Sequence, residues 1–185
     1  NATIDYLVNS NTLPVLENNP YIDNIVVFQE KQNKGFLNLI KFCKDLNQNK
    51  YDVVIDAYSK LQSWVNMLII DAPVRISYKK SGRKFLYTHT IQKSEEPATN
   101  LGLSIEHRLS LLVPIGITTP LATQPKLYLT KTEITNAKKL FNNFKVNTSR
   151  KTVMISLLGS DETKTYPLDE MAKLVNYVGD NYNVN

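Results

Sequence analysis

Short runs of apolar residues alternate along the chain with longer stretches in which apolar residues recur every three or four positions. The short runs are rich in β-branched residues, which is typical of strands that are covered on both faces. We therefore expect strands at residues 4–8, 24–28, 52–56, 74–78, 85–91 and 152–157. The longer stretches predict helices at residues 35–47 and 105–112, and three more that begin after Ser59, after Thr130 and at Pro167.

Capping residues mark where several of these helices begin. Ser59 with Gln62, and Thr130 with Glu133, have the spacing of a capping box, and Pro167 suits the first position of a helix. The apolar faces expected to turn inward are Phe36, Leu39, Ile40 and Cys43; Leu61, Trp64, Val65, Leu68 and Ile69; Ile134, Ala137, Phe141 and Phe144; and Leu168, Met171, Leu174 or Val175, and Val178.

The alternation of strands and helices predicts an α/β fold with a Rossmann-like, doubly wound parallel sheet flanked by helices. The polar stretch at residues 145–151 is the expected domain boundary, which gives a first domain at 3–145 and the beginning of a second at 151–185. Ligands of such sheets bind beyond the carboxyl ends of the strands. That rule selects Asn9 and Ser10, residues 56–59, residues 78–80 and residues 158–164.

Composition narrows the class of protein. Of the 185 residues, 42% are hydrophobic and 21% are charged, which favours a folded core over disorder. No apolar run is long enough to cross a bilayer, and the single cysteine, Cys43, excludes an internal disulfide, so we expect a cytoplasmic protein. Cys43 lies on an apolar helix face and is interpreted as a buried structural thiol. The scattered Cys43, His89 and His107 indicate no metal site, and no cofactor is expected.

The formal net charge is +5, which favours anionic partners. The densest basic group is Arg75, Lys79, Lys80, Arg83 and Lys84, and the alternative for each is an ordinary solvated side chain. Aromatic residues do not interleave with the basic ones in a known nucleic-acid-binding pattern, so we expect no nucleic acid partner.

The loop at residues 159–164, Gly-Ser-Asp-Glu-Thr-Lys, has the chemistry of an anion site. It follows an apolar run, its small residues allow close approach of the backbone, and Ser160 and Lys164 offer a hydroxyl and an ammonium. It is not a Walker loop, which requires Gly-x-x-x-x-Gly-Lys-Ser/Thr. The alternative for Lys164 is a solvated lysine.

This region resembles glycosyltransferase family 9, the bacterial enzymes that add heptose to the inner core of lipopolysaccharide. Their second domain opens with an apolar strand, a pair of small residues, several polar residues, a lysine, an aromatic residue and a proline. The matching positions here are residues 153–156, Gly159, Ser160, Lys164, Tyr166 and Pro167. The resemblance implies that Ser160 and Lys164 contact the donor's diphosphate, whereas Gly159, which departs from the family's hydroxyl version, is left with a backbone role.

The first domain carries a second part of the resemblance, which as a whole extends from Ile4 to about Tyr177. Tyr51, Asp52 and Asp56 match a Tyr-Asp-apolar-apolar-apolar-Asp element of the family, and Ser63 matches a serine common in the next helix. The acceptor-binding residues that follow from the resemblance and from the charge pattern are Asp56, Ser63, Arg75, Lys79 and Lys80. For Asp56 the alternative is a structural carboxylate that caps the following turn.

The resemblance implies an inverting glycosyltransferase of the GT-B type, with an ADP-heptose-like nucleotide sugar as donor and the lipopolysaccharide core as acceptor. It also implies peripheral contact with the inner face of the inner membrane. The family's catalytic base comes from a Gly-Asp turn after its first strand, and its second domain carries an Asp-Ser/Thr-Gly…His element; neither occurs here. We therefore expect the base to lie upstream of this chain and these 185 residues alone to be inactive. The alternative from another class is a non-catalytic Rossmann-like module that binds an anionic ligand or partner.

Overall fold

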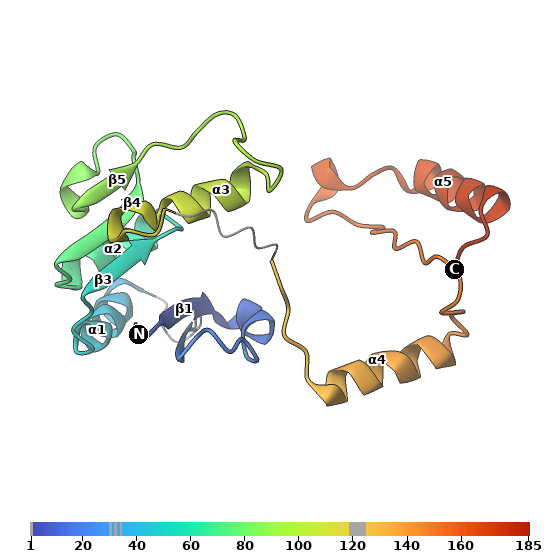
Figure 1. Ribbon diagram of the computed structural model, residues 1–185, viewed down its shortest axis with the longest axis horizontal. Helices are drawn as coiled ribbons and strands as arrows, with labels where there is room; N and C mark the ends of the chain where they lie inside the picture. The colour runs from blue at the N-terminus through green and yellow to red at the C-terminus, as the bar shows by residue number, and fades with distance from the viewer. Residues whose placement is uncertain (1, 30, 32, 34, 119–124) are drawn as a thin grey trace. The chain divides into compact units, whose positions relative to one another are not determined.

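The computed structural model describes residues 2–29, 31, 33, 35–118 and 125–185, and the side chains of all of these except Leu61 and Gln62. The chain divides into two compact units, Asn1–Tyr128 and Leu129–Asn185 (Figure 1). Because the second unit begins before helix α4 (Lys131–Asn143), the division falls ahead of the expected boundary at residues 145–151. Within the second unit, the Asn185 side-chain amide accepts from the Asn147 N–H and donates to the Asn147 carbonyl, at 3.1 and 2.7 Å.

The described residues of the first unit form two parallel sheets. Strand β1 (Asp5–Asn9) pairs with β2 (Asn24–Phe28), and β3 (Val53–Asp56), β4 (Val74–Tyr78) and β5 (His89–Ile91) pair in that order. The expected strands at 4–8, 24–28, 52–56 and 74–78 are therefore confirmed within one residue at each end. Parallel pairing throughout is the consequence of helical or irregular crossovers between successive strands.

The expected strand at 85–91 is wrong in its first half. Lys84–Leu86 forms a 3-10 turn, in which the backbone N–H groups of Leu86 and Tyr87 donate to the carbonyls of Arg83 and Lys84. Those two N–H groups are not available to a sheet ladder, so β5 begins only at His89. Leu86 and Tyr87 are both buried, against Met67 of helix α2 (Leu61–Ile69).

Helices cover both faces of the β3-β4-β5 ladder (Figure 1). Helix α1 (Phe36–Asn47) and the end of α2 enclose a cluster of Leu46, Ile70 and Ala72, against which Val54 of β3 packs. On β4, Ile76 and Tyr78 pack instead with Leu111, which follows helix α3 (Leu103–Ser110). Side chains alternate between faces along a strand, and Val54 pairs with Arg75, next to Ile76, so these two clusters lie on opposite faces.

Helix α2 departs from its expected cap and face. Its N-cap is Lys60, whose N–H donates to the Ser63 hydroxyl at 3.0 Å, so the expected Ser59–Gln62 capping box is wrong. Ser59 itself has a positive φ of 51° and belongs to the preceding turn. Leu68, expected inward, is 66% exposed, whereas Asn66 and Met67 are buried. In contrast, Cys43 is fully buried as expected, and its thiol donates to the Asn66 side-chain oxygen at 2.7 Å.

The second unit consists of α4, a 3-10 turn at Glu162–Lys164 and helix α5 (Leu168–Asn181). The expected Thr130–Glu133 capping box of α4 is confirmed, with N–H groups bonded in both directions. Pro167 is the N-cap of α5, one position before the place expected for it. In the described part of the first unit, three further 3-10 turns were not expected from the sequence pattern, at Ser10–Val15, Lys84–Leu86 and Val113–Ile115.

The expected strand at 152–157 is wrong in this structure. A strand requires a neighbour for its backbone groups, and among the described residues of this unit the pairing is limited to one bridge, Lys151 with Val184. Side chains expected to turn inward are exposed accordingly, among them Ile134, Phe141, Phe144, Leu168, Leu174 and Val175. Met171 of α5 is buried as expected.

Candidate functional site

Asp56 closes strand β3 at the carboxyl edge of the sheet, but its carboxylate is turned into the protein and is 5% exposed. One oxygen accepts from the backbone N–H groups of Tyr58 and Ser59, at 3.1 and 2.6 Å. The other accepts from the Tyr87 hydroxyl at 2.6 Å. Both oxygens are thus occupied by protein donors, which favours the turn-capping alternative over contact with an acceptor sugar.

Tyr87 is the partner that the sequence pattern missed, because it lies 31 residues from Asp56 inside a segment expected to be a strand. Burial, and then the hydrogen bond to the Asp56 carboxylate, raise the pKa of Tyr87 far above its ordinary value. The phenol therefore remains a hydrogen-bond donor at all ordinary pH values. It holds the carboxyl end of β3 against the turn that precedes β5.

Lys80 joins the same turn from the end of β4. Its ammonium donates to the Ser59 carbonyl at 2.9 Å. Ser59 is 2% exposed and has a positive φ of 51°. Asp56 and Lys80, both selected by the rule that ligands bind at the carboxyl ends of parallel strands, thus contact the same turn. The sequence pattern did not predict the positive φ of Ser59, the residue that both side chains contact.

Ser63, Arg75 and Lys79 do not join this turn. The Ser63 hydroxyl is engaged at the start of α2, where it accepts from the Lys60 N–H and donates to the Lys60 carbonyl. Arg75 is the second residue of β4 and donates weakly to the Met67 carbonyl, at 3.5 Å, in the last turn of α2. Lys79 lies four positions beyond Arg75 along the chain, about 13 Å away in extended backbone. Lys79 is exposed just beyond the strand end.

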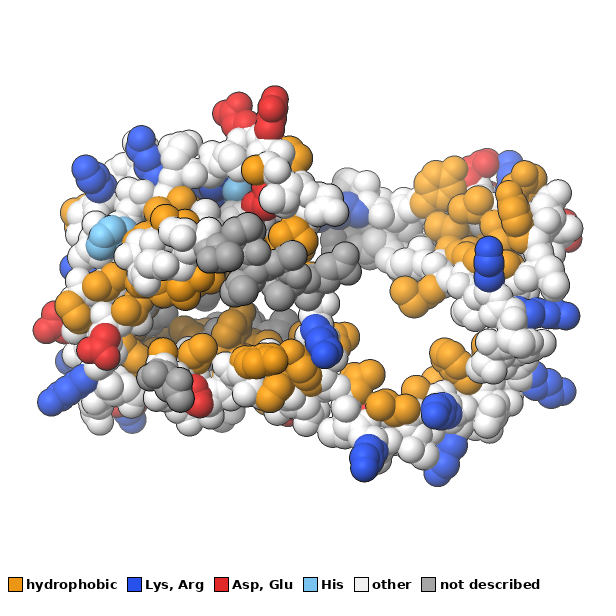
Figure 2. Space-filling model, in the orientation of Figure 1, with side chains coloured by type: hydrophobic (Ala, Val, Ile, Leu, Met, Phe, Trp, Pro, Cys, Tyr) orange, Lys and Arg blue, Asp and Glu red, His pale blue; other side chains and the backbone are white. Residues whose placement is uncertain are grey.

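The remaining members of the basic group are not gathered into one patch. The Arg83 guanidinium lies 3.7 Å from the centre of the Trp64 ring, a cation–π contact that holds it on α2. Figure 2 shows Lys and Arg side chains dispersed over the face drawn, with apolar side chains between them. For most lysines this dispersal favours the alternative of ordinary solvated side chains.

The loop at residues 159–164 of the second unit closes tightly on itself, and position 159 accommodates only glycine. A Cβ atom at Gly159 would lie 2.2 Å from the backbone oxygen of Lys164, far inside any permitted contact. The Gly159 N–H donates to the Thr165 hydroxyl at 3.1 Å, and that hydroxyl donates to the Asp161 carbonyl at 2.9 Å. The two ends of the loop are therefore held together by Thr165, a residue that the sequence comparison of motifs did not single out.

This closure brings the expected anion-site residues together. The Lys164 ammonium donates to the Ser160 hydroxyl at 3.2 Å and forms an ion pair with Asp161 at 3.1 Å. Hydrogen bonds from Thr163, from Lys164 and from Ser160 lower the pKa of Asp161 below its ordinary value, so it is ionised. The loop is exposed, with a local set of hydroxyl and ammonium donors that matches the needs of an anion.

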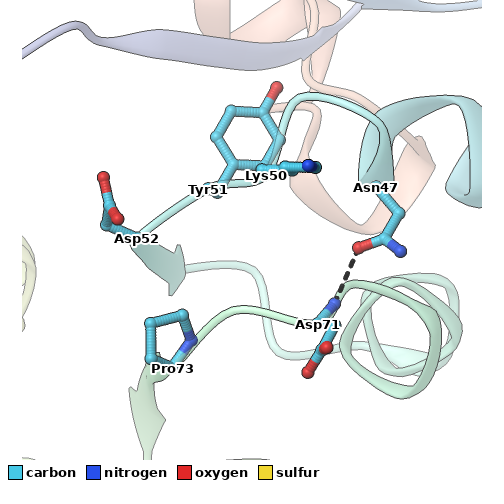
Figure 3. A pocket seen from close by; sticks show the side chains of 6 residues that line it. All are labelled: Asn47, Lys50, Tyr51, Asp52, Asp71 and Pro73. Atoms are coloured by element: carbon cyan, nitrogen blue, oxygen red, sulfur yellow. Dashed lines mark hydrogen bonds between the residues drawn. The ribbon is translucent and has the colours of Figure 1, made fainter.

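A hollow of about 360 Å³ in the first unit lies at the wrong end of the sheet for this chemistry (Figure 3). It is lined by Asn47, Lys50, Tyr51, Asp52, Asp71 and Pro73. These residues precede β3 and β4, whereas ligands of parallel sheets bind after the strands. Figure 3 shows the Asn47 side chain turned to Asp71, whose N–H it accepts at 2.8 Å. We interpret the hollow as structural.

No group of three or more His, Cys, Asp and Glu side chains within the described ranges is placed to hold a metal ion. No helix in the described part of the chain has the length and apolar character needed to span a membrane.

Comparisons with known proteins agree with the resemblance seen in the motifs. Residues 39–184 match the profile of glycosyltransferase family 9 (heptosyltransferase). The chain is 27% identical over 119 residues to lipopolysaccharide heptosyltransferase 3 of Escherichia coli, a match that covers 63% of this chain and 35% of that protein.

Two solved structures share the fold. A glycosyl transferase family 9 protein from Veillonella parvula DSM 2008 superposes with a TM-score of 0.80 at 16% identity, covering 98% of this chain and 53% of that one. The E. coli ADP-heptose lps heptosyltransferase II superposes with a TM-score of 0.65 at 17% identity, covering 99% and 54%. These likenesses confirm the expected α/β fold of the GT-B type. The chain spans between about a third and about half of the length of these relatives.

Proposed function

The chain belongs to glycosyltransferase family 9, and we propose that it is part of an inverting transferase that moves heptose from ADP-heptose to the lipopolysaccharide inner core. In this proposal residues 3–145 belong to the acceptor-side domain, and residues 151–185 begin the domain that binds the nucleotide sugar. Such an acceptor places the protein in the cytoplasm, at the inner face of the inner membrane. The family membership supports the reaction class, and the identity of the sugar and of the acceptor is the part that we propose.

The observation that carries the proposal is the closure of the 159–164 loop. Gly159 lets the backbone approach Lys164 so closely that a side chain there is excluded, and this puts the Ser160 hydroxyl and the Lys164 ammonium 3.2 Å apart. A hydroxyl and an ammonium at that spacing suit adjacent oxygens of a diphosphate. We assign Ser160 and Lys164 to the donor's diphosphate, and to Gly159 a backbone role only.

The proposed chemistry is an in-line displacement at the anomeric carbon. A carboxylate base takes the proton of the acceptor hydroxyl as its oxygen attacks, and the bond to the diphosphate breaks with inversion. Negative charge grows on the departing diphosphate, and Lys164 neutralises it where it forms. We assign the base to none of the described residues, so we expect the 185-residue chain alone to give no transfer.

On the acceptor side, the proposal gives different roles to the predicted residues. Lys79 and Lys80 stand at the carboxyl end of β4 and attract the anionic groups of the acceptor. Asp56, Ser63 and Arg75 act through position, because their polar groups are engaged in the turn after β3 and at the two ends of α2. Replacement of these three therefore acts on acceptor binding through folding.

The test is a titration of the isotope-labelled chain with inorganic pyrophosphate, followed through the amide NMR signals of residues 159–165. We expect Lys164→Ala to weaken binding about fivefold to tenfold, the range for one exposed charge-assisted hydrogen bond. The matched control is Lys173→Ala, which removes another lysine of the same unit from an i,i+3 ion pair of similar exposure. Equal affinities of the two variants would overturn the assignment of Lys164.

A second assay addresses the reaction. The purified chain is incubated with ADP-heptose and a heptose-deficient lipopolysaccharide core, and products are separated by mass. Transfer above the no-protein background would contradict our expectation that the catalytic base lies outside the described residues. Pyrophosphate binding by a full-length protein that never transfers a sugar would favour the non-catalytic binding module instead.

A further inference from the structure

Asp161 lies at the centre of the 159–164 loop, and the loop's side-chain donors converge on its carboxylate. One oxygen accepts from the Ser160 hydroxyl at 3.1 Å and pairs with the Lys164 ammonium at 3.1 Å. The other accepts from the Thr163 hydroxyl at 2.5 Å. Two hydroxyls and one ammonium thus bind a single carboxylate that belongs to the loop itself.

A carboxylate and a phosphate present similar anionic oxygens to such donors, at similar distances. The side chain of Asp161 therefore takes the place that the donors of this loop would give to an oxyanion. We infer that Asp161 is an internal competitor for the diphosphate, and that Thr163 is a third ligand of the site beside Ser160 and Lys164. The inference rests on the proposed function, which assigns this loop to the donor's diphosphate.

The loop does not depend on the Asp161 side chain for its shape. Its closure uses the Asp161 carbonyl, which accepts from the Thr165 hydroxyl at 2.9 Å and from the Lys164 N–H at 3.1 Å. The Gly159 N–H completes the closure through Thr165. When the carboxylate rotates away, these backbone contacts remain, and the three side-chain donors are left in place for an incoming anion.

The exchange is easy to make, because both partners of the ion pair are accessible. The Lys164 and Asp161 side chains are 68% and 46% exposed, so the carboxylate can turn into water without unfolding the loop. Exposed ion pairs of this kind hold their partners weakly. The displaced carboxylate still stands next to the diphosphate and repels it. Asp161 thus weakens binding twice, by competition before the ligand arrives and by repulsion afterwards.

The site should therefore bind an anion with two or more charges, such as a diphosphate, in preference to a singly charged anion. A singly charged anion offers Lys164 no more than the carboxylate already does, whereas a diphosphate brings several oxygens and more charge. In the absence of ligand, the same carboxylate neutralises Lys164 and satisfies the two hydroxyls.

The experiment is the same pyrophosphate titration, applied to Asp161→Asn and Asp161→Ala. The control is Glu162→Gln, which changes the charge equally in the same loop; within the described residues, the Glu162 carboxylate has no hydrogen bond or ion pair. We expect both Asp161 variants to bind pyrophosphate about two- to fivefold more tightly than the parent chain, and Glu162→Gln to change binding by less than about twofold. Thr163→Val in the Asp161→Asn background should weaken binding by a similar factor.

The outcomes separate this inference from the function on which it rests. If Lys164→Ala does not weaken pyrophosphate binding, the loop is not a diphosphate site and both ideas fail. If Lys164→Ala weakens binding but neither Asp161 variant tightens it beyond Glu162→Gln, the site stands and the competitor role of Asp161 is overturned. Tightening in both Asp161 variants, with the backbone signals of Gly159 and Thr165 little changed, supports the inference.

Discussion

Replacement of Tyr87 by phenylalanine tests whether Asp56 is a structural carboxylate. The change removes a single hydroxyl, which donates to the Asp56 carboxylate at 2.6 Å. Both residues are buried, at 7% and 5% exposure, so water does not readily replace the lost donor. The remaining donors to Asp56, the backbone N–H groups of Tyr58 and Ser59, bind its other oxygen.

The expected cost follows from that geometry. A hydrogen bond to a charged group contributes about 1.5–3 kcal/mol, and the carboxylate oxygen would be left buried without a donor. Loss of the hydroxyl volume adds little, because the ring remains packed against Met67 and Leu86. We therefore expect Tyr87→Phe to lower the free energy of unfolding of the first unit by about 1.5–3 kcal/mol.

The assay is urea unfolding followed by tryptophan fluorescence. Trp64 is the single tryptophan of the chain and packs against the cluster that contains Tyr87, so its signal reports on this unit. The control is Tyr58→Phe, which removes a hydroxyl from a neighbouring tyrosine that is 59% exposed and should cost less than about 0.5 kcal/mol. A loss in Tyr87→Phe no larger than in the control would refute the structural role and return Asp56 to the acceptor site.

Three further predictions concern the loop and the buried thiol. Gly159→Ala places a Cβ 2.2 Å from the Lys164 backbone oxygen and should abolish pyrophosphate binding in the NMR titration. The control, Gly179→Ala, should leave binding intact, because its Cβ meets nothing within 4 Å. Retained binding in Gly159→Ala would show that the closed loop is not required. Burial raises the pKa of Cys43 to about 11, so iodoacetamide at pH 8 should label the thiol only in urea, and rapid labelling of the folded chain would contradict its burial. Because the folded pKa lies above the unfolded value, the stability that this thiol contributes is complete below about pH 9 and should fall as the pH rises towards about 11.

The parts of the fold that the sequence predicted well are those whose cause is local. Strands β2 and β3 are short β-branched runs, and the Thr130–Glu133 box marks the start of α4 with side chains only three residues apart. The segment at 85–91 failed because its amides form a 3-10 turn, and hydrophobic pattern does not distinguish a buried turn from a buried strand. Helix α2 was found, but its buried face depends on contacts with Leu86 and Tyr87 that no helical period reveals.

The same division holds for the candidate sites. Ser160 and Lys164 are brought together by a loop of a few residues, so their spacing in the sequence was informative. The role of Asp56 depends on Tyr87, 31 residues away, and the pattern alone left its two interpretations open. Ser63 and Arg75 have residue types suited to an acceptor, but the groups they contact, at the ends of α2, are backbone atoms that no motif includes.

The loop of the second unit shows why a binding motif can be more predictable than the strand before it. Residues 152–157 need a neighbouring strand to satisfy their backbone groups, and the described part of this unit offers them a single bridge, at Lys151. The loop needs no such neighbour, since Gly159, Thr165 and the Asp161 carbonyl close it from within. Its donors are therefore set by local sequence, whether or not the preceding segment is paired. An anion site of this kind should persist in the chain even where the preceding segment is unpaired. Pyrophosphate, and not a whole nucleotide sugar, is therefore the right first probe.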